Sequence, residues 1–319
     1  MKKIFIDGES GTTGLQIRQH LKQHPEVTLI SIDEDARKNL DEKKRLIAEA
    51  DLTILCLPDM AAKEVVSAVQ SVDCRLIDAS SAHRTAAQWV YGLAELSGDH
   101  RDKIRQARRV TNPGCFATGA ILLLRPLIRS GQVRAHSPLT INAISGYSGG
   151  GAAMVREYES DAPPFAHHLY GLNFSHKHLP EMALYSGLES PPIFIPAVGN
   201  FHRGMLVSIP LFLAPGVTPE QLRECLVHSY ADEPFINVAS AQESSAVSQT
   251  RLEAQVVAGS NTVDLYVFSD PLGNDQSRAL LVARLDNLGK GASTAAVQNM
   301  NIMLGFPEFL GLLESTGEV

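Results

Sequence analysis

The first third of the chain alternates short apolar runs with amphipathic stretches. Four apolar runs predict strands: Lys3–Asp7, Val27–Ile32, Leu52–Leu57 and Arg75–Asp78. The segments between them predict helices: residues 15–24, 38–50 and 61–69. Because the apolar runs lack polar alternation, we expect both faces of these strands to be covered. Strands that alternate with helices in this way predict an α/β fold with a doubly wound parallel sheet.

After residue 115 several apolar runs alternate with polar positions. Six segments predict strands: 139–144, 193–198, 205–213, 252–257, 263–268 and 279–285. Their alternation predicts a sheet with one solvated face. Thr218, Pro219 and Gln221 have the pattern of a helix start, so a helix is expected from there to about Tyr230.

These patterns predict three parts of the chain. Residues 1–115 form the doubly wound domain, and residues 116–289 form an inserted α+β domain. Residues 290–319 contain a helix, from about 291 to 304, that returns to the first domain. A chain of 319 residues is long enough for two such domains.

Composition and charge narrow the classes of function. The chain is 44% hydrophobic and 20% charged, which is typical of a globular protein. A formal net charge of −7 argues against nucleic acid or a membrane surface as a partner, although it allows a locally positive pocket. Four cysteines without a C-x-x-C pair do not predict a disulfide framework. The chain shows no signal peptide or membrane span, so we expect a cytoplasmic protein.

A glycine turn follows the first predicted strand. The pattern Gly8-x-x-Gly11-x-x-Gly14 opens a helix, which is the context of a dinucleotide-binding turn. A plain strand-to-helix turn is the alternative. After the second strand, Asp33 and Asp35 would suit the ribose hydroxyls of NAD, whereas Arg37 and Lys38 would suit the 2′-phosphate of NADP, and the residues alone leave both open.

Cys115 follows a Pro-Gly corner and precedes a helix-compatible segment, residues 119–124. This order predicts a thiol near a helix N-terminus, where orphan N–H groups and the helix dipole favour the nucleophilic thiolate. A small buried residue after a turn is the alternative. Because Cys115 follows a dinucleotide-binding pattern, we favour a covalent nucleophile.

Other polar clusters supply candidates for the same site. His176 and His178 are candidate general acids or bases, with a solvated loop or a metal site as alternatives, although their spacing is not a zinc signature. The glycine-rich segment 145–151 offers backbone donors, with a flexible turn as the alternative. Arg203 suits a carboxylate or phosphate, with a solvated arginine in a hairpin turn as the alternative. Ser80, Ser81 and Arg84 follow the fourth strand at the edge that faces ligands in such sheets, with a simple capping role as the alternative.

The cysteine motif Asn112–Thr118, together with the glycine turn, resembles the N-acetyl-gamma-glutamyl-phosphate reductases, in their shorter, type 2 branch. Further matching segments cover nearly the whole chain: 91–96, 145–149, 176–181, 202–204 and 290–301. The resemblance implies a Rossmann-like domain with an inserted α+β catalytic domain of the semialdehyde and glyceraldehyde-phosphate dehydrogenase type. It also implies that residues 1–115 bind the dinucleotide and that residues 116–289 carry catalysis and oligomerisation.

The resemblance further implies NADPH-dependent reduction of N-acetyl-L-glutamyl 5-phosphate to the semialdehyde, with release of phosphate and no metal. Cys115 would form a thioester, and His178 would move the proton; it is preferred to His176 because it adjoins Leu179–Glu181. The expected cofactor-binding residues are Gly8, Ser10, Gly11, Thr12, Thr13, Gly14, Arg37, Ser80, Ser145, Gly146 and Asn299. The expected substrate-binding residues are Asn112, Arg84, Ser148, Gly149 and Arg203. The expected partners are the small-molecule acyl phosphate and further copies of the chain, as a dimer or tetramer.

Three alternatives remain. A reductase of the same architecture would act on aspartyl phosphate or an aminoadipyl analogue. A dinucleotide sensor would keep the fold without the chemistry, but it would have no use for the cysteine and histidine candidates. A cysteine hydrolase would leave the glycine turn without a purpose.

Overall fold

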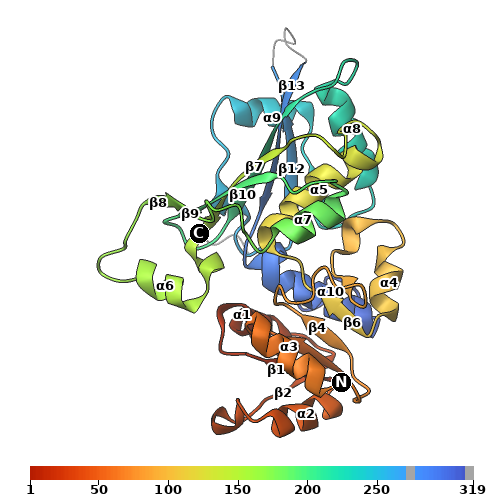
Figure 1. Cartoon of the computed structure of the whole chain (residues 1–319), viewed down its shortest axis with the longest axis vertical. Helices are drawn as coiled ribbons and strands as arrows, with labels where there is room; N and C mark the ends of the chain where they lie inside the picture. The colour runs from red at the N-terminus through yellow and green to blue at the C-terminus, as the bar shows by residue number, and fades with distance from the viewer. Residues whose placement is uncertain (271–276, 313–319) are drawn as a thin grey trace. The chain divides into compact units, whose positions relative to one another are not determined.

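The computed structural model describes residues 1–270 and 277–312, which divide into two compact units (Figure 1). Unit 1 joins residues 1–114 to the C-terminal segment from residue 292, and unit 2 runs from residue 115 to residue 291. Within the described residues, none of the helices has the length and apolar character needed to cross a bilayer.

Unit 1 is built on a six-stranded parallel sheet with the strand order β2-β1-β3-β4-β6-β5. The strands are β1 (Lys2–Asp7), β2 (Val27–Ile30), β3 (Leu52–Leu55), β4 (Leu76–Asp78), β5 (Val90–Tyr91) and β6 (Arg109–Thr111). The order reverses between β1 and β3, because β2 lies on one side of β1 and β3 on the other. The predicted doubly wound parallel sheet is therefore confirmed.

Helices cover both faces of this sheet. They are α1 (Thr12–Lys22), α2 (Leu40–Glu49), α3 (Asp59–Ala68), α4 (His100–Gln106) and α10 (Thr294–Leu304). The first strand shows why its sequence lacks polar alternation. Ile4 and Ile6 enter the core shared with α1 and α10, whereas Phe5 enters the core shared with α2 and α3. Helix α10 packs against α1 and α4, so the C-terminal segment belongs to unit 1.

Unit 2 is built on a mixed seven-stranded sheet with the order β11-β12-β13-β10-β7-β9-β8. The strands are β7 (Thr140–Gly146), β8 (His167–Leu169), β9 (Ile193–Gly199), β10 (Met205–Phe212), β11 (Ile236–Val238), β12 (Val263–Phe268) and β13 (Arg278–Leu285). The helices are α5 (Cys115–Arg129), α6 (Ala152–Tyr158), α7 (Leu179–Ser186), α8 (Pro219–Ser229) and α9 (Ala241–Ser248). Helices α5 and α8 pack on the sheet, and α7 packs on α5.

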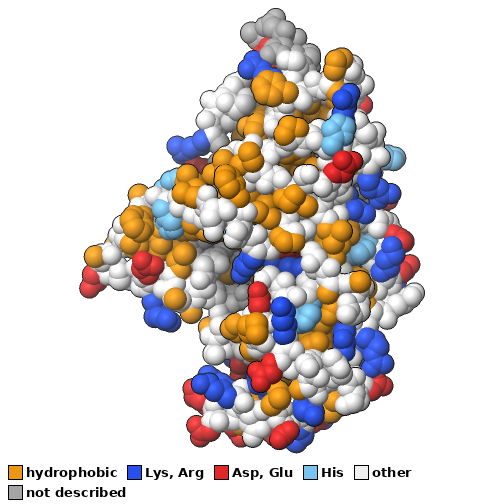
Figure 2. Space-filling model, in the orientation of Figure 1, with side chains coloured by type: hydrophobic (Ala, Val, Ile, Leu, Met, Phe, Trp, Pro, Cys, Tyr) orange, Lys and Arg blue, Asp and Glu red, His pale blue; other side chains and the backbone are white. Residues whose placement is uncertain are grey.

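The two faces of this sheet differ in how much of each is covered by helices. Along β10, Val207 and Ile209 are buried on the face that carries α5. The opposite face carries exposed hydrophobic side chains, which include Phe212, Leu280 and Ile193. Figure 2 shows hydrophobic side chains gathered at the surface of unit 2. The prediction of a sheet with one less covered face therefore holds, but part of that face is apolar rather than polar.

The predicted strand at residues 252–257 is wrong. Its last four residues form a 3-10 turn, η4 (Ala254–Val257), which leaves Val256 exposed and Val257 buried. The turn packs on β10 and β13, which are already paired with each other. β13 also has β12 on its other side, so no edge beside these strands remains for the segment. Gly259, whose φ is +86°, then turns the chain toward β12.

Candidate active site

The glycine turn lies between β1 and α1 at the point where the strand order of unit 1 reverses. Gly8 has a φ of +90°, and a Cβ there would lie 2.3 Å from the backbone oxygen of Cys56. A Cβ on Gly14 would lie 2.4 Å from the backbone oxygen of Gly8. Packing within the protein therefore requires both glycines, because each brings two backbone segments into close approach.

Gly11 differs from the other two glycines. A Cβ there would meet its nearest neighbour, the backbone oxygen of Gly8, at 3.5 Å, which is an ordinary contact. Gly11 is also the N-cap of α1, and no side chain caps the helix there. The first N–H groups of α1 are thus accessible beside a residue without a side chain, as the pyrophosphate of a dinucleotide requires. Ser10 is exposed in the same turn, and Thr12 and Thr13 are half-buried at the start of α1. The turn therefore fits a nicotinamide dinucleotide.

Hydrogen bonds to the buried Asp78 carboxylate hold the loop that follows β4. Asp78 is fully buried, and its carboxylate accepts hydrogen bonds from the backbone N–H and hydroxyl of Ser80, each at 2.9 Å, and pairs with His83 Nδ1 at 2.6 Å. His83 stacks on Trp89 with 4.6 Å between ring centroids. Ser80 is thereby fixed at the carboxyl edge of the sheet.

Arg84, Asn112 and Asn299 are joined to one another in unit 1. Arg84 donates to the backbone oxygens of Asn112 at 3.0 Å and Ala79 at 3.3 Å. The Asn112 side chain donates to the backbone oxygen of Ala292 at 2.8 Å and accepts from Asn299 at 3.2 Å. Asn299 also donates to the backbone oxygen of Gly92 at 2.8 Å. These three residues hold the segment that leads into the cysteine motif.

Cys115 is the first residue of α5, as the sequence predicts, and its side chain is half-buried. A Cβ on Gly291 would lie 2.7 Å from Cβ of Cys115, so the thiol is placed against a backbone that must lack a side chain. None of the four cysteines forms a disulfide. Burial, together with the carboxylates of Asp7 and Asp78, raises the pKa of Cys56 to about 12. Cys56 is therefore a neutral thiol, whereas Cys115 has the position that favours a thiolate.

His178 and His176 lie close to the residue that follows the cysteine. His178 is the buried N-cap residue of α7, and both imidazole rings lie 5.9 Å from the ring of Phe116. His176 Nδ1 accepts the backbone N–H of His178 at 3.1 Å, and Nε2 contacts the hydroxyl of Tyr170 at 3.3 Å. An accepting Nδ1 places the proton of the neutral His176 ring on Nε2. His176 is thus held in one tautomer.

Tyr170 is a residue that sequence reasoning missed. Burial and then the nearby negative charge of Cys115 raise the pKa of the Tyr170 hydroxyl, which stays neutral at physiological pH. Tyr170 follows β8, an edge strand of three residues whose sequence carries no strong signal. Only the folded sheet brings Tyr170 near Cys115 and His176.

Arg203 is anchored by a buried carboxylate. Asp286 is fully buried, and its Oδ2 lies 2.6 Å from Arg203 Nη2. Asp286 also accepts the backbone N–H groups of Gly259 at 2.6 Å and Leu288 at 2.9 Å. Arg203 Nε is buried and has no hydrogen-bond partner among the described residues. The Arg203 side chain is nevertheless 22% exposed, so the accessible part of its guanidinium can meet an anionic ligand.

The glycine-rich loop after β7 is tied to the turn that carries Arg203. Ser148 is buried; its hydroxyl donates to the backbone oxygen of His202 and accepts from Asn287 Nδ2 at 2.9 Å. Asn287 Oδ1 accepts the backbone N–H of Gly204 at 2.9 Å. Ser145 and Gly146 are buried at the end of β7, and Gly149 is exposed. Ser148 thus uses its hydroxyl to hold the loop rather than presenting it to solvent.

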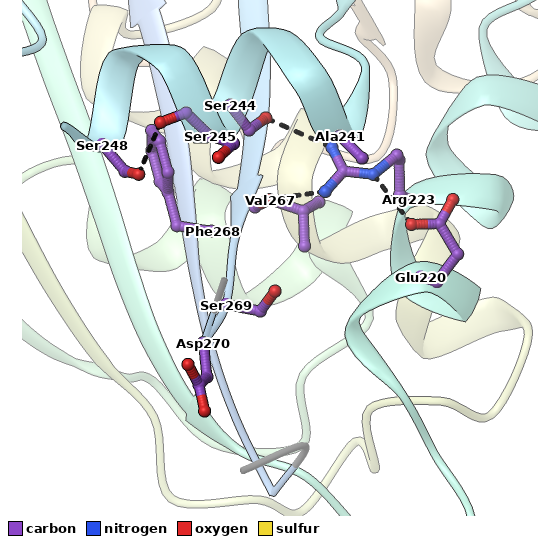
Figure 3. A pocket seen from close by; sticks show the side chains of 10 residues that line it. All are labelled: Glu220, Arg223, Ala241, Ser244, Ser245, Ser248, Val267, Phe268, Ser269 and Asp270. Carbon is purple, nitrogen blue, oxygen red and sulfur yellow. Dashed lines mark hydrogen bonds and ion pairs between the residues drawn. The ribbon is translucent and has the colours of Figure 1, made fainter. Parts of the chain in front are cut away.

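A well-formed cavity elsewhere in unit 2 does not belong to this site. Its volume is about 170 Å³, and Figure 3 shows the ten residues that line it, none of which is a predicted site residue. Arg223 donates to the backbone oxygens of Ala239 and Val267, each at 2.8 Å, and to Ser244 at 3.2 Å, and it pairs with Glu220 at 3.2 Å. These bonds tie α8 to α9 and β12, so the role of Arg223 is structural.

Within the described ranges no group of three or more His, Cys, Asp or Glu side chains is arranged to hold a metal ion. His168 Nδ1 contacts the hydroxyl of Tyr158 at 3.0 Å.

Comparisons with known proteins agree with both units. Residues 3–107 match the model of the semialdehyde dehydrogenase NAD binding domain, and residues 115–287 match the semialdehyde dehydrogenase dimerisation domain. Among solved structures, the chain is similar to aspartate semialdehyde dehydrogenase from Francisella tularensis, with a TM-score of 0.70 at 14% identity over 95% of this chain and 100% of that one. It is also similar to aspartate semialdehyde dehydrogenase II from Vibrio cholerae, with a TM-score of 0.65 at 14% identity over 96% of this chain and 98% of that one.

The fold and the two domain matches thus define a protein of the semialdehyde dehydrogenase class with a nicotinamide cofactor. Among curated proteins, the chain is 50% identical to N-acetyl-gamma-glutamyl-phosphate reductase from Trichormus variabilis over 97% of this chain and 99% of that protein. It is 46% identical to the protein of the same name from Sinorhizobium medicae over 95% of this chain and 98% of that protein. The chain belongs to the N-acetyl-gamma-glutamyl-phosphate reductase family, so the family predicted from its motifs is confirmed.

Proposed function

We propose that the protein catalyses the NADPH-dependent reduction of N-acetyl-L-glutamyl 5-phosphate to N-acetyl-L-glutamate 5-semialdehyde, with release of phosphate, as a step of arginine biosynthesis. The names of its relatives support this reaction. The single structural observation that carries the proposal is Cys115, which begins α5 with its Cβ packed against Gly291. This position gives the thiolate that attack on an acyl phosphate needs.

The first half of the reaction forms the thioester. The Cys115 thiolate attacks the carbonyl carbon of the acyl phosphate, the carbon–oxygen bond to the phosphate breaks, and inorganic phosphate leaves with the electron pair. Arg203, oriented by Asp286, binds an anionic part of the substrate through the accessible part of its guanidinium. The first N–H groups of α5 stabilise the oxyanion that develops during the attack.

The second half releases the aldehyde. The nicotinamide, when bound, supplies the hydride that reduces the thioester carbon. His178 donates a proton to the oxyanion that results, and takes it back when the carbon–sulfur bond breaks and Cys115 leaves as thiolate. His176, fixed by Tyr170 and by the backbone of His178, positions the neighbouring ring. This division of roles supports His178 over His176 as the acid and base.

We propose that residues 1–115 with 290–319 bind the cofactor and that residues 116–289 carry catalysis and oligomerisation. The cofactor contacts are Gly8, Ser10, Gly11, Thr12, Thr13, Gly14 and Ser80 in unit 1, with Ser145 and Gly146 in unit 2. Arg84, Asn112 and Asn299 act by positioning the cysteine loop, because their side chains bond to backbone oxygens or to each other. Ser148 positions the loop that presents Gly149.

We propose a homo-oligomer that forms through the face of the unit 2 sheet opposite α5. That face carries Phe212, which is 90% exposed, and the exposed side chains of Leu280 and Ile193. An exposed apolar patch on a sheet face is typical of an interface. The description of the matching model as a dimerisation domain supports this assignment. We also propose the cytoplasm as the location, because the chain uses four cysteines without a disulfide.

The deciding experiment is the reverse, phosphate-dependent oxidation of N-acetylglutamate semialdehyde, run with NADP and NAD in parallel. We expect turnover with N-acetylglutamate semialdehyde and NADP to exceed turnover with NAD. Equal or better turnover with aspartate semialdehyde would overturn the substrate assignment. Cys115→Ser should keep NADPH binding and lose turnover by several orders of magnitude, with Cys56→Ser as the matched control. Retained turnover in Cys115→Ser would contradict a covalent mechanism.

A further inference from the structure

Three side chains from three elements of unit 1 meet beside the glycine turn. Glu9 lies within the turn, Arg18 lies on α1, and Ser31 directly follows β2. Arg18 Nη1 pairs with Glu9 Oε2 and donates to Ser31 Oγ at 3.3 Å. Ser31 Oγ in turn donates to Glu9 Oε2 at 3.4 Å. The cluster joins the turn to the end of the second strand.

The position of this cluster bears on cofactor choice. In doubly wound sheets the adenosine ribose lies between the glycine turn and the end of the second strand, where an acidic residue selects NAD and an arginine accepts a 2′-phosphate. Here β2 ends at Ile30, and the residue that follows is Ser31 rather than an acid. Asp33 lies further along the chain, as the N-cap residue of η1 (Glu34–Ala36).

Arg37, one of the two cations that the sequence suggests for this role, contacts a different carboxylate. It lies outside η1 and pairs with Glu34 at 3.4 Å. Arg18 has a hydroxyl partner as well as a carboxylate, and its side chain is 32% exposed. An ion pair this exposed adds little to the free energy of unfolding, so a contribution to stability does not by itself explain why these three side chains meet.

We propose that Arg18 and Ser31 bind the 2′-phosphate of NADPH, and that Glu9 pairs with Arg18 when no 2′-phosphate is present. The inference rests on the proposed NADPH-dependent function. A phosphate carries more charge than a carboxylate and offers three acceptor oxygens, so it displaces Glu9 from the guanidinium. NADH, which has a hydroxyl at this position, leaves the Glu9–Arg18 pair in place. Glu9 therefore opposes NADPH binding, and Arg18 and Ser31 favour it.

The test measures binding of two cofactor fragments to the full chain by calorimetry: adenosine 2′,5′-bisphosphate, which carries the 2′-phosphate, and 5′-AMP, which lacks it. Arg18→Ala should weaken binding of the bisphosphate by about 10- to 100-fold and leave 5′-AMP binding unchanged, because hydrogen bonds between charged groups are lost. Glu9→Gln should tighten bisphosphate binding several-fold. Arg45→Ala, which removes a surface arginine paired with Glu42 and Glu49, is the matched control and should keep the wild-type ratio.

The outcomes separate this inference from the proposed function. If the wild type binds both fragments equally, the proposed use of NADPH fails and the inference fails with it. If the wild type prefers the bisphosphate and Arg18→Ala keeps that preference, only the inference is overturned. Equal weakening of both fragments in Arg18→Ala, or loss of the preference in Arg37→Ala alone, also overturns it. If Arg18→Ala does not fold, Glu9→Gln provides the test. Unchanged or weaker bisphosphate binding in Glu9→Gln would contradict the proposal that the 2′-phosphate displaces the Glu9 carboxylate from Arg18.

Discussion

The ion pair between Arg203 and Asp286 allows substrate contact and structural support to be measured separately. We consider Arg203→Ala, Asp286→Asn and the double variant. Arg203→Ala leaves a fully buried carboxylate with two backbone donors, from Gly259 and Leu288. Asp286→Asn keeps the shape of the side chain and leaves Arg203 without its charged partner. Each single variant therefore perturbs folding through the same pair.

The geometry sets the expected magnitudes. Removal of one partner from a buried ion pair costs about 3–5 kcal/mol of the free energy of unfolding. Asp286 keeps two N–H donors, and the Arg203 side chain is 22% exposed, so we expect about 2–3 kcal/mol for Arg203→Ala. Asp286→Asn should cost less, about 1–2 kcal/mol, because water can solvate part of the guanidinium. The double variant should reveal a coupling of about 1–2 kcal/mol.

The two substitutions should be coupled in their effect on stability, whereas the loss of activity should depend on Arg203 alone. If Arg203 binds the substrate, kcat/KM falls by about 100-fold in Arg203→Ala, as loss of charge-assisted bonds implies. The double variant should show the same loss, because the substrate contact is absent in both. Urea unfolding and steady-state kinetics on the four proteins provide the measurement. The reasoning is refuted if the two substitutions are additive in stability, or if the double variant regains the activity that Arg203→Ala loses.

Three further substitutions test other parts of the structure. Gly291→Ala should slow alkylation of Cys115 by iodoacetamide and cost about 1–3 kcal/mol of stability, since the new methyl would meet Cβ of Cys115 at 2.7 Å; an unchanged alkylation rate would argue against this contact. Burial lowers the pKa of His24 below 6.5, so the unfolded state takes up a proton at a higher pH than the folded state does. Neutral His24 therefore contributes stability above pH 6.5, and this contribution is lost as the pH falls through the folded-state pKa. His24→Gln should remove that slope, at most about 1.4 kcal/mol per pH unit, in urea titrations from pH 5 to 8, and a persisting slope would assign it to another group. Phe212→Glu should shift sedimentation toward the monomer, whereas Val256→Glu, at a residue 66% exposed outside the sheet, should not; equal shifts would count against the proposed face.

The sequence predicts β1 to β4 of unit 1 for a physical reason, whereas it does not predict the short strands β5 and β6. A strand covered on both faces needs apolar residues at every position, and short apolar runs bounded by amphipathic helices are compatible with few structures besides a buried parallel strand. β1 illustrates this, since Ile4 and Phe5 enter two different cores. The position of Cys115 at a helix start is also predictable, because a Pro-Gly corner and the helical segment after it are local signals.

Long-range contacts explain what the sequence does not predict. Residues 252–257 have a strand-like pattern, yet they form a 3-10 turn because β13 already has a strand on each side. The contribution of Tyr170 depends on the neighbours that β8 and β9 bring to it. Asp286 follows a strand without any motif, and its importance lies in partners distant in sequence, Arg203 above all.

The site residues that the motifs single out fall into two physical groups. Asn112, Arg84, Ser148 and Asn299 direct polar atoms to backbone oxygens or to one another. Buried polar groups of this kind cost stability when a partner is removed. The Arg203 guanidinium is in part accessible, and its loss should therefore lower substrate binding even where its ion pair is already broken. The hydrogen bonds of a motif residue thus indicate whether it binds the substrate or holds the protein around the site. Loss of a residue that holds the protein should lower stability and activity together, whereas loss of a substrate-binding residue should lower activity separately from stability.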